Sequence, residues 1–416
     1  MTALAQPVAT VTAPAPKIRR YKPDALLWVA VAFMWMNVWR FQELWSPLGK
    51  AKVSLMLEWV LLVLVATQTS KIRSWKWPAS KIFAAPLMLI GLMLLSLPLN
   101  LYPGQGLTFI TKDYGPTLLM FVSLAVGIRE RDDLEFVSFA HLLGATVYSL
   151  YVFKFVPIGW DGRLGGLVYY DANDYGLLLV CALPFAIYFA RPGVSTAKRV
   201  IAVGALALFV LMIVKSGSRG AFLGFIAVMA IIIWRYRAIP KRLRYGSAIA
   251  AISMLSLFGS ARYWTMMKSI LHPNDDYNTT SPVGRKAVWK RGMGYMLKRP
   301  AFGVGAAAFS TAEGVLSETS KEFEANGGGF KWSTAHNSFV LVAAEEGLPG
   351  ILLFVSMIWL LIRQLSEVQA PPRGSPLVLP ADAAFAQAMM VSVVGFCVAG
   401  FFVSAAYSPG VRDITL

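Results

Sequence analysis

The sequence predicts an all-α polytopic membrane protein with about 11–12 transmembrane helices and one large loop that contains short helices. The chain has 416 residues, of which 56% are hydrophobic and only 15% are charged. A soluble protein of this size does not need so many apolar residues, because part of its exterior must face water. Apolar runs of roughly 17–22 residues recur along the chain, and about 20 residues cross a bilayer as a helix. One long polar stretch, residues 262–335, interrupts these runs.

The apolar runs give a series of candidate spans in chain order. These spans cover residues 25–39, 53–68, 82–102, 108–128, 136–156, 175–190, 199–217, 218–237, 247–261, 336–362 and 381–407. The organisation that follows has four parts along the chain. They are an N-terminal tail (1–24), the first nine transmembrane helices (25–261), the large loop (262–335) and the C-terminal transmembrane helices (336–416).

The two ends of the chain lie outside the predicted spans. Residues 1–16 carry no charge and lack a signal-peptide pattern, so we expect a flexible tail. After the last span, which ends near Tyr407, the remaining residues are too few for another crossing. Eleven spans would place the C-terminus outside, whereas a twelfth helix in a longer natural chain would return it to the inside. Cys181 and Cys397 lie within apolar spans, so the sequence predicts neither a disulfide framework nor a metal site built on them.

Basic residues are concentrated in alternate short loops. They are frequent at 17–22, 71–81, 191–199 and 235–244, and sparse in the short loops between these. Because Lys and Arg accumulate on the cytoplasmic side of membrane proteins, we expect a cytoplasmic N-terminus and an outward-facing large loop. The net charge of +17 follows mostly from this asymmetry and from contact with phospholipid headgroups. We do not interpret the charge as a sign of nucleic-acid binding.

A tight outward turn, Lys-Ser-Gly-Ser-Arg-Gly at 215–220, joins two long apolar runs. Arg219 lies at the predicted N-terminal end of a helix, where backbone N–H groups and the helix dipole favour anions. Gly217 and Gly220 would let a ligand approach the backbone closely, and a guanidinium offers paired donors that suit phosphate. The alternative is that Lys215 and Arg219 reach toward lipid headgroups. The sequence context favours anion binding.

Two further outward segments carry charged residues beside apolar runs. Lys112 and Asp113 lie in the opening turns of an otherwise apolar span. Arg163 begins a segment that leads through Asp171 to Asn173 at the start of the next span. We therefore include Lys112 and Arg163 among the candidate ligands of an anion on the outer face.

The large loop contains a stretch, residues 285–298, whose composition is compatible with a helix bearing an imperfect apolar stripe. Arg285 opens this stretch in a Gly-Arg-x3-Trp setting that ends at Trp289. An amphipathic helix on the outer leaflet would explain the basic residues of the stretch without any catalysis. Residues 317–331 have the composition of a mobile segment that could act as a lid.

His336 stands at the end of the polar loop, where an apolar helix resumes. An imidazole has an intrinsic pKa of about 6.5 and suits acid or base catalysis at such a surface; a helix-capping or interfacial histidine is the alternative. Of the other histidines, His141 falls inside an apolar span and is expected to be packed or interfacial, and His272 precedes a turn and is expected to be solvated. Two adjacent acids and a Gly-Leu-Pro-Gly sequence at 345–350 predict a polar cavity or a helix interruption.

Six short motifs follow one another in a characteristic order. They are Arg163-Leu-Gly-Gly with Asn173, Ser218-Arg219-Gly220, Gly284-Arg285-x3-Trp289, Pro300-x2-Gly303-x-Gly305-x3-Phe309, His336-Asn337-Ser-Phe339 and Glu346-Gly347-x2-Gly350. In this order and spacing they resemble the O-antigen ligase/polymerase superfamily. Within it the chain is most similar to O-antigen ligases and to the O-glycosylation ligases that accompany exosortase systems. The resemblance runs from about residue 163 to residue 350, and the first five spans match only in general character.

The resemblance implies glycan transfer on the periplasmic side of the bacterial inner membrane. The donor would be a glycan on undecaprenyl diphosphate, and the acceptor a lipid A-core sugar, a growing glycan or a protein hydroxyl. The outward arginine of the family corresponds to Arg219, its Gly-Arg-x3-Trp arginine to Arg285 and its loop histidine to His336. The family usually has about twelve spans, so the end of this chain departs from that pattern.

These residues suggest one mechanism. The donor diphosphate would be held by Arg219, Arg285, Lys112, Arg163 and Lys215. His336 would act as the base that deprotonates the acceptor hydroxyl. No Asp-x-Asp motif faces outward and Asp275-Asp276 stands alone, so we expect a metal-independent glycosyltransferase. We also expect a monomer that needs no cofactor and contacts membrane lipids. The alternatives are a glycan polymerase of the same superfamily, a transporter of lipid-linked glycans and a non-catalytic scaffold.

Overall fold

The computed structural model describes residues 21–68, 81–167, 170–235, 240–272, 274, 276–330, 332–370 and 378–407. The predicted tail at 1–16 lies outside these residues. So does the chain after Tyr407, on which the question of a twelfth helix depends.

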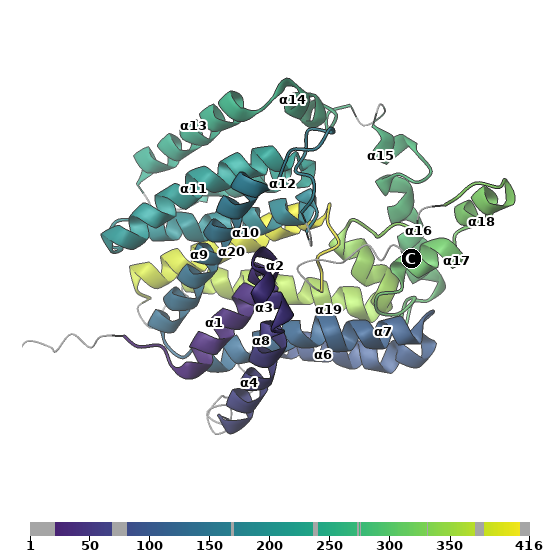
Figure 1. Cartoon of the computed structure of the whole chain (residues 1–416), viewed down its shortest axis with the longest axis horizontal. Helices are drawn as coiled ribbons and strands as arrows, with labels where there is room; N and C mark the ends of the chain where they lie inside the picture. The colour runs from purple at the N-terminus through teal and green to yellow at the C-terminus, as the bar shows by residue number, and fades with distance from the viewer. Residues whose placement is uncertain are drawn as a thin grey trace, which may run out of the picture.

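The described residues fold into α-helices joined by turns and short loops (Figure 1). The first helices are α1 (Ala25–Asn37), α2 (Phe41–Leu44), α3 (Ser46–Lys50), α4 (Val53–Thr67), α6 (Lys81–Ser96), α7 (Pro103–Phe109), α8 (Gly115–Gly127) and α9 (Arg131–Phe155). The central helices are α10 (Ala172–Ala190), α11 (Thr196–Ser216), α12 (Arg219–Arg235) and α13 (Lys241–Phe258). The loop helices are α14 (Ala261–Lys268), α15 (Tyr277–Thr280), α16 (Arg285–Lys298), α17 (Phe309–Val315) and α18 (Glu318–Ala325). The last two are α19 (Ser338–Gln369) and α20 (Pro380–Gly400).

The helices have the length and apolarity of membrane spans, which confirms the predicted all-α polytopic class. Five of those described, α9, α10, α11, α19 and α20, are long and apolar enough to cross a membrane. Shorter apolar helices lie at 25–37, 53–67, 83–99 and 244–258. Large apolar side chains also face outward, such as Trp234, which is 80% exposed, and Leu257, which is 79% exposed. Lipid is the environment in which such a surface is stable.

The bundle has two main apolar cores that α20 connects. One core is formed by residues of α1, α9, α10, α11 and α12, and the other by residues of α6, α7, α16, α17 and α19. Helix α20 packs against α10, α12 and α19 and so joins the two parts. Figure 1 shows α14 to α18 gathered toward one end of the long helices, which we call the loop end.

Helix α19 is interrupted near its start, as the acids and the Gly-Leu-Pro-Gly sequence predict. Gly347 has φ 66° and ψ −160°, which breaks the helix two residues before Pro349. The loop after α16 binds this interruption through backbone hydrogen bonds from Val304 N to Ala344 O, from Gly305 N to Glu345 O and from Leu348 N to Pro300 O, at 2.8–2.9 Å. The broken turn therefore keeps partners for its backbone groups, as buried polar groups require.

The predicted end of one span was wrong, and two other segments contain features that the sequence did not indicate. The span predicted at 381–407 is helical only to Gly400, because residues 403–405 turn back and bind Ser338 instead of continuing the helix. The span at 108–128 contains a π-helical turn at Ile110–Tyr114, just before Pro116, which lacks the N–H of a regular helix. The segment predicted to be mobile contains α18, whose first turn is capped by Ser317.

Candidate functional site

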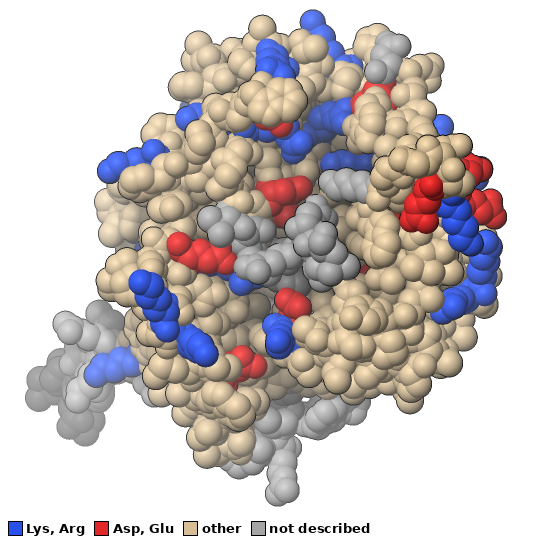
Figure 2. Space-filling view, turned by 45° about the vertical axis from the view of Figure 1, so that its right-hand side comes forward, with Lys and Arg blue, Asp and Glu red and all other residues tan. Residues whose placement is uncertain are grey.

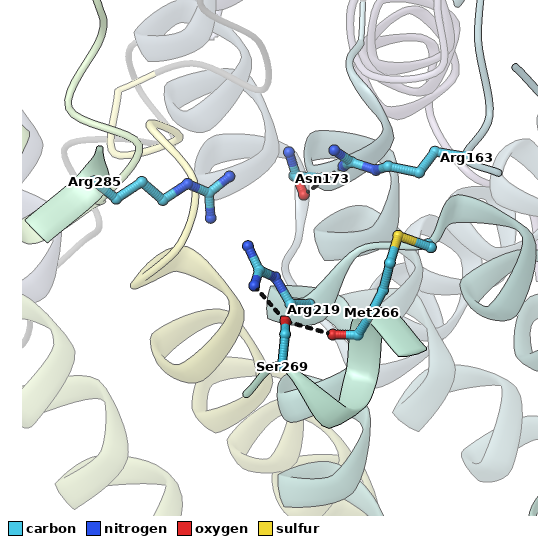
Figure 3. Close-up of a pocket in the computed structure, with 7 residues that line it drawn as sticks. Arg163, Asn173, Arg219, Met266, Ser269 and Arg285 are labelled. Carbon is cyan, nitrogen blue, oxygen red and sulfur yellow. Dashed lines mark hydrogen bonds between the residues drawn. The ribbon is translucent and has the colours of Figure 1, made fainter. Parts of the chain in front are cut away.

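A pocket of about 180 Å³ lies at the loop end. It is lined by Arg163, Asn173, Gly217, Arg219, Met266, Ser269 and Arg285 (Figure 3). Its three arginines come from the loop before α10 and from the first residues of α12 and α16. Figure 2 shows a hollow on a face of the molecule, with Lys and Arg side chains gathered above it.

The start of α10 places Asn173 in the pocket wall. Asp171 caps the helix by accepting hydrogen bonds from Asn173 N at 2.6 Å and Asp174 N at 2.8 Å. The buried amide oxygen of Asn173 accepts hydrogen bonds from Arg163 Nη2 and from Ser218 Oγ, both at 2.9 Å. Asn173 thus connects an arginine of one segment to the turn before α12.

The turn between α11 and α12 brings Arg163 and Arg219 to the same pocket. Gly217 has φ 61°, which favours glycine, and a Cβ built there would lie 2.8 Å from Arg163 Cγ. Ser218 then begins α12 by accepting a hydrogen bond from Ala221 N at 3.2 Å. The Ser-Gly-Ser-Arg sequence therefore permits close contact with the stem of Arg163 and places Arg219 at the first residue of the helix.

Arg285 is the first residue of α16, whose N-cap, Gly284, provides no side-chain hydrogen bond to the helix N-terminus. Among the residues that the structure describes, Arg285 has no hydrogen bond or ion pair. Burial lowers the pKa of Arg285 to about 10, and the charges of Arg219 and Arg163 contribute in the same direction, while Asp171 opposes them. The guanidinium still carries its charge at neutral pH, and its surroundings favour the arrival of an anion.

Arg219 is held along one edge of its guanidinium. Its Nη1 donates a hydrogen bond to Ser269 Oγ at 2.7 Å and forms an ion pair with the carboxylate of Asp276. Figure 3 shows the guanidinium groups of Arg219 and Arg285 extending into the same space, with Arg163 directed at Asn173. First-turn residues of α10, α12 and α16 thus meet at one pocket, where the helix dipoles add to the arginine charges.

His336 is not among the residues that line the pocket, but it is linked to that region through Trp289. Trp289 Nε1 donates a hydrogen bond to Ala335 O at 2.9 Å, and its ring lies 6.2 Å from that of Phe402. Phe402 in turn lies against Gly220, where an added Cβ would be 2.7 Å from Phe402 Cβ. The residue before His336 is therefore hydrogen-bonded to Trp289, which lies about one helical turn after Arg285 in α16.

The backbone holds His336 in an uncommon conformation. Its φ is 45°, in the left-handed region, and the next residue, Asn337, caps α19 by accepting from Phe339 N and Val340 N. Asn337 is fully buried, so the capped start of α19 fixes the position at which His336 leaves the loop. Left-handed non-glycine residues are concentrated at functional sites.

Lys112 and Lys215 do not line the pocket. Lys112 is exposed on the π-helical turn, and the ammonium group of Lys215 lies 4.3 Å from the centroid of the Phe153 ring. The structure therefore brings together Arg163, Arg219 and Arg285, and leaves the two predicted lysines outside this group. Their participation stays a prediction.

The remaining histidines lie where they were expected. His141 packs between aromatic rings, 5.0 Å from Trp39 and 6.2 Å from Phe185, and His272 is exposed. Within the described part of the chain, no group of three or more His, Cys, Asp or Glu side chains could hold a metal ion.

Sequence reasoning did not identify the polar residues that support the arginines. Ser269 and Asp276 hold Arg219, and Asn173 holds Arg163. Asp276 lies 57 residues after Arg219, so no local pattern indicates their ion pair. Asn173 was named only as part of a motif. Its position in the first turn of a predicted helix was the feature that could have indicated a role in the site.

One family model matches the part of the chain that contains most of this site. None of the curated proteins matches the chain. A family model described as O-antigen ligase matches residues 204–355. This match covers α12 and the loop helices, and it includes Arg219, Arg285 and His336. Residues 204–355 of this multi-pass membrane protein are therefore similar to the O-antigen ligase family.

Proposed function

We propose that this enzyme transfers a glycan from undecaprenyl diphosphate to an acceptor hydroxyl at the periplasmic face of the bacterial inner membrane. One observation carries the proposal: Arg163, Arg219 and Arg285, from three distant segments, line one pocket. The orientation rests on the distribution of basic residues among the short loops, which favours a cytoplasmic N-terminus.

The pocket suits a diphosphate better than a single carboxylate. It presents three guanidinium groups, and each can offer paired donors to phosphate oxygens. Negative charge grows on the diphosphate as the glycosidic bond breaks, so cations already in place stabilise the transition state more than the bound donor. Arginines can in this way replace the metal ion that other glycosyltransferases use, and we expect transfer without one.

His336 is the proposed base. It would take the proton from the acceptor hydroxyl while the acceptor oxygen bonds to the sugar carbon and the diphosphate leaves with the bonding electron pair. Three observations support this role: the link of Ala335 to Trp289, the short helical distance from Trp289 to Arg285, and the left-handed backbone of His336. A diphosphate needs no proton to leave, so the mechanism requires no general acid.

A ligase and a polymerase of the same superfamily use the same kind of donor and differ in the acceptor. We favour ligation to a lipid A-core sugar or a similar hydroxyl, with a monomer as the active species. We assign Lys112 and Lys215 to the approach of the anionic donor, because they lie outside the pocket lining.

The test uses the purified protein in detergent with phospholipid, a labelled glycan on undecaprenyl diphosphate, and EDTA. Lipid A-core and free glycan are offered as separate acceptors. Transfer to lipid A-core in EDTA is expected, and the variants Arg219→Ala and Arg285→Ala should each lower kcat/KM by at least about 10²-fold. The matched control is Arg299→Ala, an exposed arginine just beyond the opposite end of α16, which should transfer normally.

The outcomes separate the alternatives. Extension of the free glycan alone would identify a polymerase. Movement of the donor from one leaflet of a vesicle membrane to the other, without transfer of the glycan to an acceptor, would identify a transporter. Normal transfer by both pocket variants would refute the assignment of the pocket to the diphosphate.

A further inference from the structure

Only one edge of the Arg219 guanidinium is bound by protein groups among the described residues. Nη1 carries both contacts, one to Ser269 Oγ at 2.7 Å and one to the Asp276 carboxylate. Both partners belong to the segment that follows α14. Figure 3 shows the other end of the guanidinium pointing away from Ser269, toward the space beside Arg285 and Asn173. The opposite edge of Arg219 is thus available to a ligand.

The two groups that hold Arg219 are themselves fixed. Asp276 Oδ1 caps α15 by accepting hydrogen bonds from Asn278 N and Asn278 Nδ2, both at 2.9 Å, which leaves Oδ2 for Arg219. The Asp276 side chain is only 12% exposed. Ser269 Oγ donates its proton to Met266 O at 2.8 Å, so it can only accept from Arg219. A carboxylate and a hydroxyl that are each held by further hydrogen bonds therefore determine the direction of the guanidinium.

The other two pocket arginines are not held in this way. Arg163 binds the neutral amide of Asn173, and Arg285 has no hydrogen bond or ion pair within the described chain. Arg219 is the pocket arginine with a carboxylate partner among the described residues. Three guanidinium groups in a small space repel one another. The negative charge of Asp276 behind one of them reduces that repulsion, although Asp276 itself does not line the pocket.

We propose that Asp276, assisted by Ser269, is a positioning residue that orients Arg219 so that its free edge meets the diphosphate of the lipid-linked donor. This inference rests on the function proposed above. Its rival is that the carboxylate is an internal anion that competes with the donor for Arg219. The rival predicts the opposite sign for the loss of the carboxylate, because its removal would then strengthen donor binding.

The experiment measures donor kcat and KM for Asp276→Asn and Asp276→Ala in the full-length purified protein. Asparagine can keep the cap of α15 through its single amide oxygen, but it loses the charge and places an NH2 group where Oδ2 meets Arg219. Alanine loses the cap as well. Because small displacements of a positioning group cost up to about 10²-fold, we expect kcat/KM to fall about 10-fold for the asparagine variant and about 10²-fold for the alanine variant. Glu322→Gln, which alters an exposed acid on α18, is the matched control.

A double-variant cycle separates positioning from a purely structural role. If Asp276 acts through Arg219, then Asp276→Ala should have little further effect once Arg219→Ala is present. If the residual activity of the variants is too low to measure, the same comparison of single and double variants uses their affinity for undecaprenyl diphosphate, measured by calorimetry in mixed micelles. Thermal unfolding of each variant shows whether activity is lost because less protein is folded. If the alanine variant does not fold, the asparagine variant still tests the proposal.

Each outcome decides the matter. A higher kcat/KM or a lower donor KM for Asp276→Ala would overturn the positioning role in favour of the internal competitor. Effects that simply add to those of Arg219→Ala would reduce Asp276 to a structural cap. Impaired Arg219→Ala with a normal Asp276→Ala would refute this inference and leave the proposed function standing. Normal transfer by Arg219→Ala would instead refute the role of that arginine in the proposed function.

Discussion

Trp289 Nε1 and the backbone carbonyl of Ala335 are joined by a 2.9 Å hydrogen bond that ties α16 to the residue before His336. Ala335 is fully buried, so this carbonyl depends on the indole for a partner. The Trp289 ring also packs on Phe401, at 5.1 Å, and on Phe402. One side chain therefore connects the helix that starts with Arg285, the residue before the proposed base and the chain after α20.

The first prediction concerns this hydrogen bond. Trp289→Phe keeps the ring packing but leaves the Ala335 carbonyl without its donor, at a cost of about 1–3 kcal/mol. We expect kcat to fall by at least about 10-fold, since His336 follows the released carbonyl, while the KM for the donor changes little. Steady-state kinetics with the labelled donor would measure this. Trp332→Phe, in the same loop, should behave as the unmodified protein does, and an unchanged kcat for Trp289→Phe would contradict the prediction.

The second prediction concerns the base. His336→Ala should lower kcat by about 10²–10⁴-fold and leave the affinity for undecaprenyl diphosphate intact, because His336 does not line the pocket proposed to bind the diphosphate. The matched control is His272→Ala, an exposed histidine of the same loop. Transfer by His336→Ala at the normal rate would end the base hypothesis.

The sequence predicted most helices of this fold but not their packing. Apolar runs indicate where spans lie, and residues 285–298 were correctly expected to be helical. Helices such as α1 and α11 are apolar around their whole circumference, so their sequences do not indicate which face meets a neighbour. The connection of the two cores by α20 could therefore be seen only in the structure.

Candidate site residues were predicted where a local motif marks them. Arg219 follows Ser-Gly-Ser, and Arg285 follows a glycine at the start of a helix. Asp276 was judged an isolated acid, because a carboxylate that pairs with an arginine 57 residues away leaves no periodic signal. Residues 401–407 were assigned to a helix on hydropathy alone. Hydropathy does not indicate that Ser338 forms hydrogen bonds with the backbone of Val403 and Ala405.

The third prediction tests whether the pocket binds an anion. Asn173→Ala removes the acceptor that holds Arg163 and should raise the donor KM about 10-fold, the effect of a lost hydrogen bond to a charged group. Asn173→Asp keeps the shape but adds a negative charge to the pocket wall, so the donor should bind still more weakly. Asn326→Asp, at an exposed position after α18, controls for the change in net charge. If the aspartate variant binds the donor as well as the unmodified protein does, the pocket is not the diphosphate site.

The last prediction concerns the loop that clamps the interrupted start of α19. Gly303 has φ 61°, and a Cβ built on it would lie 2.3 Å from Ala344 O and 2.5 Å from Glu345 O. Gly303→Ala therefore meets both a left-handed backbone, which costs about 1–2 kcal/mol, and a contact with backbone atoms that have no room to move. We expect a lower temperature of thermal unfolding. We also expect reduced transfer, because the displaced loop would release Gly305 N and Val304 N from α19.

The matched control for Gly303→Ala is Gly294→Ala within α16, where nothing lies within 4 Å of an added Cβ. Alanine has a higher helix propensity than glycine by about 1 kcal/mol, so this variant should be at least as stable as the unmodified protein. Thermal unfolding of the two variants in the same detergent compares one added methyl group at each position. Equal unfolding temperatures for both would contradict the clamp, since an added Cβ would meet the backbone of α19 at Gly303 and nothing at Gly294.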